Sequence, residues 1–313
     1  MHIELDFLFT VQQVAVMFVL ILIGYIAGKS KLVSVKGQQD LSQLILYVTL
    51  PITLFNSLQI QASKDQYLTA LSIMGGILIG SLIAIVIGYL TRPLFATSSL
   101  DQQNVIRSSF LLYNASFMGY PILMALFGSE VLFYAVIGTN ILFEFFVWTL
   151  GRQWMSRTTD QSAPFSVKKI LLAPGIVATI LGLTFSLGQI PVVEPFSTAF
   201  DMISPATSPL AMILVGLILS RSDLKKTLTQ PLLYKISFIK LLVVPLVLLM
   251  VLKIIGVQGL ALAIPVLQLG MPSAAYLVMF ATNYDNESEL ASGIVLLTSL
   301  LSILTIPLLT LFM

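Results

Sequence analysis

Two short polar segments inside long apolar runs hold the residues best suited to bind a ligand. They share an amide residue followed by Gly-x-Pro, and the residues concerned are Asn114, Gly119, Tyr120, Pro121, Gln268, Gly270, Pro272 and Ser273. Proline lacks a backbone N–H and breaks or kinks a helix, and an amide side chain both donates and accepts hydrogen bonds. In a membrane such a break is tolerated where it faces protein or a watery cavity. Each segment is therefore expected to be two half-helices joined by an unwound stretch.

The physical chemistry of such a break favours an anion. A half-helix that begins at proline presents unpaired N–H groups and the positive end of its dipole. Two antiparallel half-helices crossing at mid-membrane would form a site for a carboxylate, to which Asn114 and Gln268 would add amide groups. The alternative is that Gly/Pro kinks serve helix packing, which is common in membrane helices. The matching positions of the two segments favour the site.

Charged residues inside apolar runs are expensive in a membrane and indicate function or pairing. Glu144, in NILFEFFVWTL, is the first candidate for proton or sodium coupling, with Asn140 on the same helix face as its expected partner. Asp201, in STAFDMISPATS, is a second coupling candidate. The alternatives are a structural hydrogen bond for Glu144 and a place at the outer interface for Asp201. Lys240 is expected to pair with an acid or to snorkel to the cytoplasmic interface.

Further polar candidates follow a mid-span proline. Thr53 and Asn56 come after Pro51 and are expected to line the substrate path, although a polar contact between helices explains them equally well. Trp148 is expected to anchor a span end at the membrane interface. The chain has no cysteine and a single histidine, His2, so a metal site or a Ser-His catalytic pair is not expected. No cofactor is expected either.

The elements that carry these residues are expected to be membrane helices. Of the 313 residues, 57% are hydrophobic and only 10% are charged, whereas a soluble domain carries about 25% charged residues. Ten apolar runs approach the roughly 20 residues that a spanning helix needs. The expected spans are residues 9–28, 40–60, 67–91, 103–127, 131–150, 171–189, 195–219, 232–255, 258–281 and 289–312. The residues before the first run include Glu4 and Asp6 but no lysine or arginine, so this run is interpreted as a retained helix and not as a signal peptide.

The placement of Lys and Arg predicts the orientation in the membrane. With the N-terminus outside, 13 of the 16 Lys and Arg residues fall in cytoplasmic connections, whereas Lys64 and Lys253 fall in outer ones. We therefore expect a multi-pass protein of the cell membrane with both termini outside. The net charge of +2 gives no basic excess that would indicate nucleic-acid binding.

The expected spans divide into two halves. Residues 1–150 form the first half, 151–170 a cytoplasmic linker and 171–313 the second half. Five spans in each half would make the second half enter the membrane from the opposite side, which is the arrangement of an inverted repeat. A mid-span proline recurs in the second span of each half and Gly-x-Pro recurs in the fourth. The fourth and ninth spans are therefore the expected discontinuous helices.

The motif Asn114-x-x-x-Met118-Gly119-x-Pro121 resembles the crossover motif of the auxin efflux carrier family, which includes plant PIN carriers and bacterial malate-permease-like proteins. The stretches LQLGMPSAAYLVMFATNY and SPLAMILVGLIL are also similar, and the resemblance covers nearly the whole chain. It implies ten helices in two inverted repeats, a homodimeric scaffold of helices 1, 2, 6 and 7, and an elevator-like unit of helices 3–5 and 8–10. It also implies that Asn114 helps to bind a substrate carboxylate, with Gln268 in the matching place. The short linker resembles the bacterial branch, which favours malate over auxin.

The expected function is secondary transport of a small organic anion, such as malate or an auxin-like acid, coupled to a proton or a sodium ion. The alternative is a sodium-coupled carrier of the bile-acid or antiporter type, which has a similar crossed-helix layout. An intramembrane aspartyl protease is disfavoured because the sequence has no Gly-x-Gly-Asp stretch. A receptor would be expected to carry a soluble signalling domain, for which the sequence offers no candidate.

Overall fold

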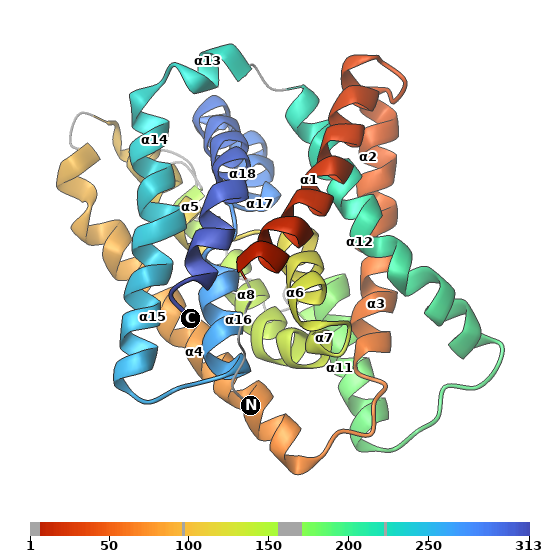
Figure 1. Ribbon diagram of the computed structural model, residues 1–313. Coiled ribbons are helices and arrows are strands. Elements are labelled where there is room, and N and C mark those ends of the chain that lie inside the picture. Colours follow the sequence, from red (N-terminus) through yellow and green to blue (C-terminus); the bar gives the residue numbers. More distant parts are fainter. Residues whose placement is uncertain (1–6, 96–97, 156–170, 222–223) are drawn as a thin grey trace.

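The computed structural model describes residues 7–95, 98–155, 171–221 and 224–313, and every regular element within them is a helix (Figure 1). Most of the predicted linker, residues 156–170, lies outside the described part of the chain. Six helical stretches are long and apolar enough to cross a membrane, namely Val11–Lys29, Lys64–Leu90, Val131–Met155, Phe196–Ser220, Pro231–Ile254 and Ser288–Thr310. The expected all-helical architecture is confirmed for these residues, while the count of ten spans stays a prediction.

The helices follow one another with short connections. Before the gap at 156–170 they are α1 (Phe7–Lys29), α2 (Val35–Leu44), η1 (Ile45–Thr49), α3 (Leu50–Ser57), α4 (Lys64–Leu90), η2 (Arg92–Phe95), α5 (Leu100–Leu111), η3 (Ala115–Gly119), α6 (Tyr120–Phe127), α7 (Val131–Ala135), η4 (Val136–Asn140), α8 (Ile141–Phe146), η5 (Val147–Gly151) and α9 (Arg152–Met155). After it they are α11 (Pro174–Leu187), α12 (Phe196–Ser220), α13 (Leu224–Leu228), α14 (Pro231–Phe238), η6 (Ile239–Val243), α15 (Val244–Ile254), α16 (Leu260–Leu269), α17 (Ala275–Asn283) and α18 (Ser288–Thr310).

Large apolar side chains cover the outside of several helices. Leu22 and Ile26 of α1 and Leu82 and Leu90 of α4 are all exposed. Exposed apolar surface on this scale is unfavourable in water, whereas hydrocarbon chains of a bilayer accept it. The outer faces of α1 and α4 therefore fit a lipid environment.

Three π-helical turns, which are wider than the turns of an α-helix, each end two residues before a proline. They are η1 before Pro51, η3 before Pro121 and η6 before Pro245. Proline removes one backbone hydrogen bond, and its ring collides with the carbonyl one turn earlier in a regular α-helix. A wider turn relieves this collision, so each of these prolines lies within a helix that continues through it.

Helices α1 and α12 approach each other closely along small residues. A Cβ atom at Gly24 of α1 would overlap the carbonyl oxygen of Ile213, and one at Gly28 would overlap the hydroxyl of Ser220. Gly24 and Gly28 are four residues apart, as are Gly216 and Ser220 on α12. This small-xxx-small spacing is how membrane helices bring their backbones together.

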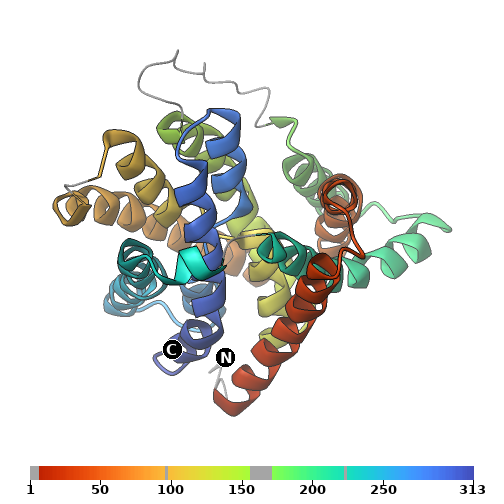
Figure 2. The same cartoon turned by 90° about the horizontal axis from the view of Figure 1, so that it is seen from above.

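Seen from above, the helices gather in two groups (Figure 2). Helices α1 and α2, in red, and α11 and α12, in green, lie on one side. Helices α4, in orange, and α14 and α15, in cyan and blue, lie on the other, with α17 and α18 between them. The site described next lies where the two groups meet.

Candidate functional site

Two interrupted helices cross each other through their breaks. Helix α5 ends at Leu111 and the next helix begins at Ala115, while α16 ends at Leu269 and α17 begins at Ala275. The unwound residues pair as a short antiparallel bridge centred on Tyr113 and Ser273. Its two hydrogen bonds run from the Asn114 N–H to the Pro272 carbonyl and from the Ala274 N–H to the Leu112 carbonyl, both 2.8 Å. Each break thereby satisfies backbone groups of the other, as a bilayer requires.

The positions of the half-helix starts correct one expectation. The sequence predicted that each second half-helix begins at its proline, but the first begins at Ala115, well before Pro121, and the second begins at Ala275, after Pro272. Asn114 caps the first start, because its Oδ1 accepts the N–H of Phe117 at 3.2 Å. The wide turn of η3 then carries the helix past Pro121, so the break falls at 112–114 instead.

A pocket of about 330 Å³ opens beside this crossing. The starts of both second half-helices form one wall, and α2, η1, α3, η4, α8, η5 and the start of α11 form the others. Its lining is Ser42, Leu46, Tyr47, Leu50, Tyr113, Asn114, Ala115, Ser116, Phe117, Asn140, Phe143, Glu144, Trp148, Ala173, Pro174, Gly175, Ala274, Ala275, Tyr276 and Met279. Six of these side chains are aromatic, and none of the lining residues is Lys, Arg or His.

The crossing places the first turns of two helices at the pocket wall. The first turn of any helix leaves N–H groups without intrahelical partners, and the dipole makes that end positive. Two such turns, at Ala115–Phe117 and Ala275–Tyr276, line the same pocket. In the first turn the Ala115 N–H donates to the Tyr113 carbonyl and the Phe117 N–H donates to Asn114. Ser116 supplies the remaining backbone N–H of that turn. With its Oδ1 occupied by the cap, Asn114 has its Nδ2 without a protein acceptor among the described residues. This arrangement suits a carboxylate.

Glu144 lies in the same pocket and is 6% exposed. Its two oxygens accept hydrogen bonds from the Trp148 Nε1–H at 2.9 Å and from the Tyr276 hydroxyl at 3.3 Å. Trp148 was expected to be an interface anchor, and its bond to Glu144 gives it a place inside the protein. The structure thus brings Asn114 and Glu144, two residues predicted separately, into one cavity.

Asn140 also lines the pocket, but its expected pairing with Glu144 is wrong. Its Nδ2 donates to the hydroxyl of Thr179 on α11 at 2.9 Å. The wide turns of η4 and η5 flank α8 and change the regular spacing of side chains around this helix. Asn140 therefore joins two helices, and Trp148 and Tyr276 are the hydrogen-bond partners of Glu144 instead.

Gln268 does not line the pocket. Its side chain is fully buried against the backbone of Gly119, where an added Cβ would come within 2.5 Å of the Gln268 Oε1 atom. Neither of its amide atoms has a hydrogen-bond partner among the described residues. The absence of a side chain at Gly119 allows this contact. Of the two predicted amide residues, Asn114 therefore lines the pocket, and Gln268 is buried in the protein without lining it.

The other predicted residues of the two motifs build the crossing. Ser273 donates from its Oγ to the Ser109 carbonyl at 3.1 Å and from its N–H to the Thr298 hydroxyl at 3.2 Å. The remaining residues are buried in the two helix segments without lining the pocket, namely Tyr120, Pro121, Gly270 and Pro272.

Thr53, Asn56 and Asp201 lie away from the pocket. The Thr53 hydroxyl contacts the Thr207 hydroxyl at 2.8 Å, in the packing of α3 against α12. The Asn56 Nδ2 donates to the Asp201 carboxylate at 3.0 Å in an exposed position. The partners of Thr53 and Asn56 both lie on α12, which favours the alternative of polar contacts between helices for these two residues.

Sequence reasoning missed the three tyrosines of the pocket. Tyr113 directly precedes the motif asparagine, Tyr276 follows the second break, and Tyr47 stands in η1. Only the position of Tyr113 beside Asn114 was a usable signal. Tyrosines near span ends are ordinarily interface anchors, which hides such residues in a membrane sequence.

Long apolar helices, combined with two broken helices that cross beside a pocket with a few polar groups among apolar walls, define a class of protein, the multi-pass membrane transporters. The sequence profile described as membrane transport protein matches residues 9–164 and 156–310. The chain belongs to this family, which is the auxin efflux carrier family that the crossover motif predicted. Its membership points to a transporter and not to an enzyme.

Two archaeal relatives are similar over nearly their full length. An uncharacterized transporter of Methanothermobacter thermautotrophicus is 27% identical over 314 residues, covering 96% of this chain and 98% of the relative. An uncharacterized transporter of Methanocaldococcus jannaschii is 25% identical over 301 residues, covering 94% and 96%. The similarity therefore extends over both predicted halves.

Proposed function

We propose that this transporter carries a monocarboxylate with an apolar body across the cell membrane. The observation that carries the proposal is the pocket beside the crossing, in which two half-helix starts and Asn114 offer donors for one carboxylate. Aromatic rings make up much of the remaining wall. Apolar walls with a few convergent polar groups are typical of sites for small organic ligands.

The residues that line the pocket favour one of the two cargoes that the sequence suggested. A second carboxylate, as in malate, would need a second set of charged or hydrogen-bonding partners, because an unpaired buried charge is very unfavourable. The lining contains no Lys, Arg or His, and its one charged residue is the acid Glu144. The pocket therefore favours an auxin-like acid over malate.

Glu144 is the proposed coupling group. A substrate carboxylate and an ionised Glu144 in one small pocket would repel each other, which favours the protonated form of one of them. Binding of the anion together with a proton on Glu144 avoids this repulsion. The proton would then cross the membrane with the substrate, and a sodium ion in place of the proton is the alternative that the experiment below distinguishes.

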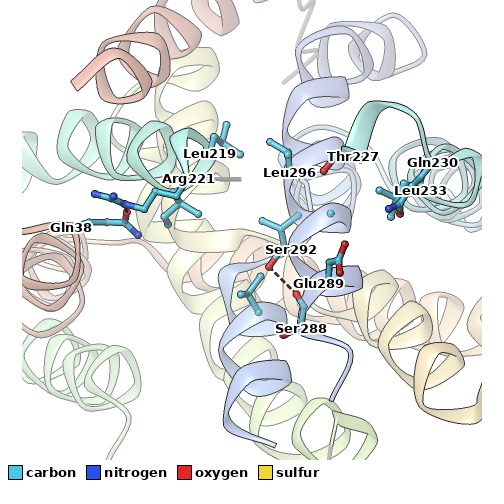
Figure 3. A pocket seen from close by; sticks show the side chains of 14 residues that line it. Gln38, Leu219, Arg221, Thr227, Gln230, Leu233, Ser288, Glu289, Ser292 and Leu296 are labelled. Carbon is cyan, nitrogen blue, oxygen red and sulfur yellow. Dashed lines mark hydrogen bonds between the residues drawn. The ribbon is translucent and has the colours of Figure 1, made fainter. Parts of the chain in front are cut away.

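The proposed movement is of the elevator type, between the two helix groups of Figure 2. The close contact of α1 with α12 supports a rigid scaffold, and the substrate pocket lies between this group and the crossing helices. A second cavity, of about 420 Å³, separates Gln38 and Arg221 on one side from Ser288 and Ser292 of α18 on the other (Figure 3). We assign α1–α3, α11 and α12 to the scaffold and the other helices to the moving unit, as two inverted repeats of five spans.

The proposed scaffold also offers a surface for a second copy. A groove of about 800 Å³ is lined almost wholly by apolar side chains of α3, α11, the following connection and the start of α12. Phe55, Phe185 and Phe200 stand in this lining, with ring centroids of Phe55 at 5.3 Å from Phe185 and 5.8 Å from Phe200. These features support a homodimer joined through the scaffold. The placement of Lys and Arg supports an orientation with both termini of each copy outside the cell.

Uptake into proteoliposomes tests the proposed function. Labelled phenylacetate and malate are compared at pH 7 to 8, with pH and sodium gradients imposed separately and protein-free liposomes as the control for passive entry. We expect saturable phenylacetate uptake at least about tenfold faster than malate uptake, because malate would bury an unpaired charge. A pH gradient, and not a sodium gradient, should drive it. Equal uptake of malate would contradict the proposed cargo, and sodium drive would contradict the proton.

A further inference from the structure

Lys240 occupies a place that neither of its sequence interpretations anticipated. It lies in η6 and is fully buried, so it does not snorkel to an interface. Its Nζ donates to the carbonyl oxygens of Phe110 at 3.2 Å and of Leu269 at 3.0 Å. Within the described part of the chain, its hydrogen-bond partners are these two backbone carbonyls and no acidic side chain.

These two carbonyls belong to matching places in the crossing. Phe110 is in the last turn of α5 and Leu269 is the last residue of α16, the two half-helices that end at the breaks. The last turn of a helix leaves carbonyl groups without partners, and the dipole makes that end negative. The buried ammonium group of Lys240 therefore donates hydrogen bonds to the negative ends of both half-helices, α5 and α16.

A count of charge shows what Lys240 does to the neighbouring pocket. Each helix end carries about half an elementary charge, positive at the start and negative at the finish. Four ends meet at the crossing, two of each sign, so their fields would largely cancel at the pocket. The charge of Lys240 offsets the two negative ends and leaves about one positive charge at the two helix starts. This net positive charge is equal in size and opposite in sign to the charge of one carboxylate.

We infer that Lys240 is the charge-balancing and positioning residue of the proposed anion site, acting on the substrate without touching it. This inference rests on the proposed function. Lys240 does not line the pocket, but its Nζ lies 5.6 Å from the ring centroid of Tyr113, which does. Tyr113 is also the centre of the bridge between the two breaks. Lys240 therefore contacts both half-helix ends of the crossing, and it also contacts Tyr113, which lines the pocket.

Three substitutions separate the charge of Lys240 from its hydrogen bonds. Lys240→Met removes both, Lys240→Gln keeps amide donors without charge, and Lys240→Arg keeps the charge. A purely structural tie would leave the Gln and Arg variants alike in anion affinity. A charge-balancing role makes Gln resemble Met and leaves Arg close to the unsubstituted protein. The control is Lys235→Met, which removes an exposed lysine of α14.

The measurement is the Kd of the purified protein for phenylacetate and for its uncharged analogue phenylacetamide, by calorimetry. We expect the phenylacetate Kd to rise at least about tenfold in the Met and Gln variants, because a charge acts strongly at low dielectric, and less than about threefold in Arg and in the control. The phenylacetamide Kd should change little. An unchanged phenylacetate Kd in folded Lys240→Gln would overturn the inference.

Two further outcomes keep the inference testable. If neither neutral variant folds, Lys240→Arg decides alone, and a tenfold rise of its phenylacetate Kd would overturn the inference. If the unsubstituted protein binds neither probe, the proposed function fails, and this result differs from normal binding that is insensitive to Lys240.

Discussion

Replacing Asn114 with alanine is expected to reduce phenylacetate uptake at least about tenfold. The substitution removes the Nδ2 group, whose hydrogen bond to a charged carboxylate is worth about 1.5–3 kcal/mol. It also removes the Oδ1 cap on the Phe117 N–H, which costs about 1 kcal/mol of stability. Uptake into proteoliposomes measures the first effect, and thermal unfolding in detergent measures the second.

Three matched variants assign the loss to its cause. Asn114→Ser keeps a cap on the half-helix but has no amide donor, so it should fold better than Asn114→Ala and transport as poorly. Asn114→Asp also keeps the cap and adds a repelling charge, so it should be inactive. Asn56→Ala makes the same change outside the pocket and should transport normally. Full uptake by folded Asn114→Ala would rule out the proposed site.

Replacing Glu144 with glutamine is expected to abolish accumulation driven by a pH gradient. If one proton crosses with each anion, the free energy of the proton gradient sets the substrate gradient. A difference of one pH unit across the membrane then sustains about a tenfold difference in substrate concentration. Glutamine has no exchangeable charge, so the variant should exchange substrate across the membrane without accumulating it. One of the two donors, Trp148 or Tyr276, must then face the amide NH₂ group.

The experiment for Glu144 separates coupling from binding. Accumulation is measured with a pH gradient, and exchange of labelled for unlabelled phenylacetate is measured at equal pH. Glu130→Gln, an exposed carboxylate before α7, is the control and should behave as the unsubstituted protein does. Normal accumulation by Glu144→Gln under a pH gradient would exclude Glu144 as the proton carrier.

Much of the framework could be predicted from the sequence because membrane helices obey strong local rules. Apolar runs predicted the helices, and Gly-x-Pro in two of them predicted the interruptions. Asn114 and Glu144 stood out because a polar group in an apolar run must have a partner or a function. These local signals led to two residues of one pocket without showing that they would meet.

The rest depends on partners that are distant in the chain. Asn140 forms a hydrogen bond with Thr179, and Asn56 forms one with Asp201. Both hydrogen bonds join different helices, so the spacing of residues within one helix does not predict them. The place of Lys240 requires both breaks to be folded against each other, so a single run such as ISFIKLLVVP contains no sign of it. Wide turns also shift side chains around a helix, and the wide turn of η3 lies between the start of its half-helix at Ala115 and Pro121.

The location of a bound carboxylate tests the central claim most directly. A structure of the protein with 4-bromophenylacetate, solved with the anomalous signal of bromine, would place both ends of the ligand. We predict that the carboxylate lies at Asn114 and the starts of the two half-helices, with bromine among the aromatic side chains of the same pocket. A ligand bound elsewhere, or one in this pocket with its carboxylate turned away from both helix starts, would contradict the account.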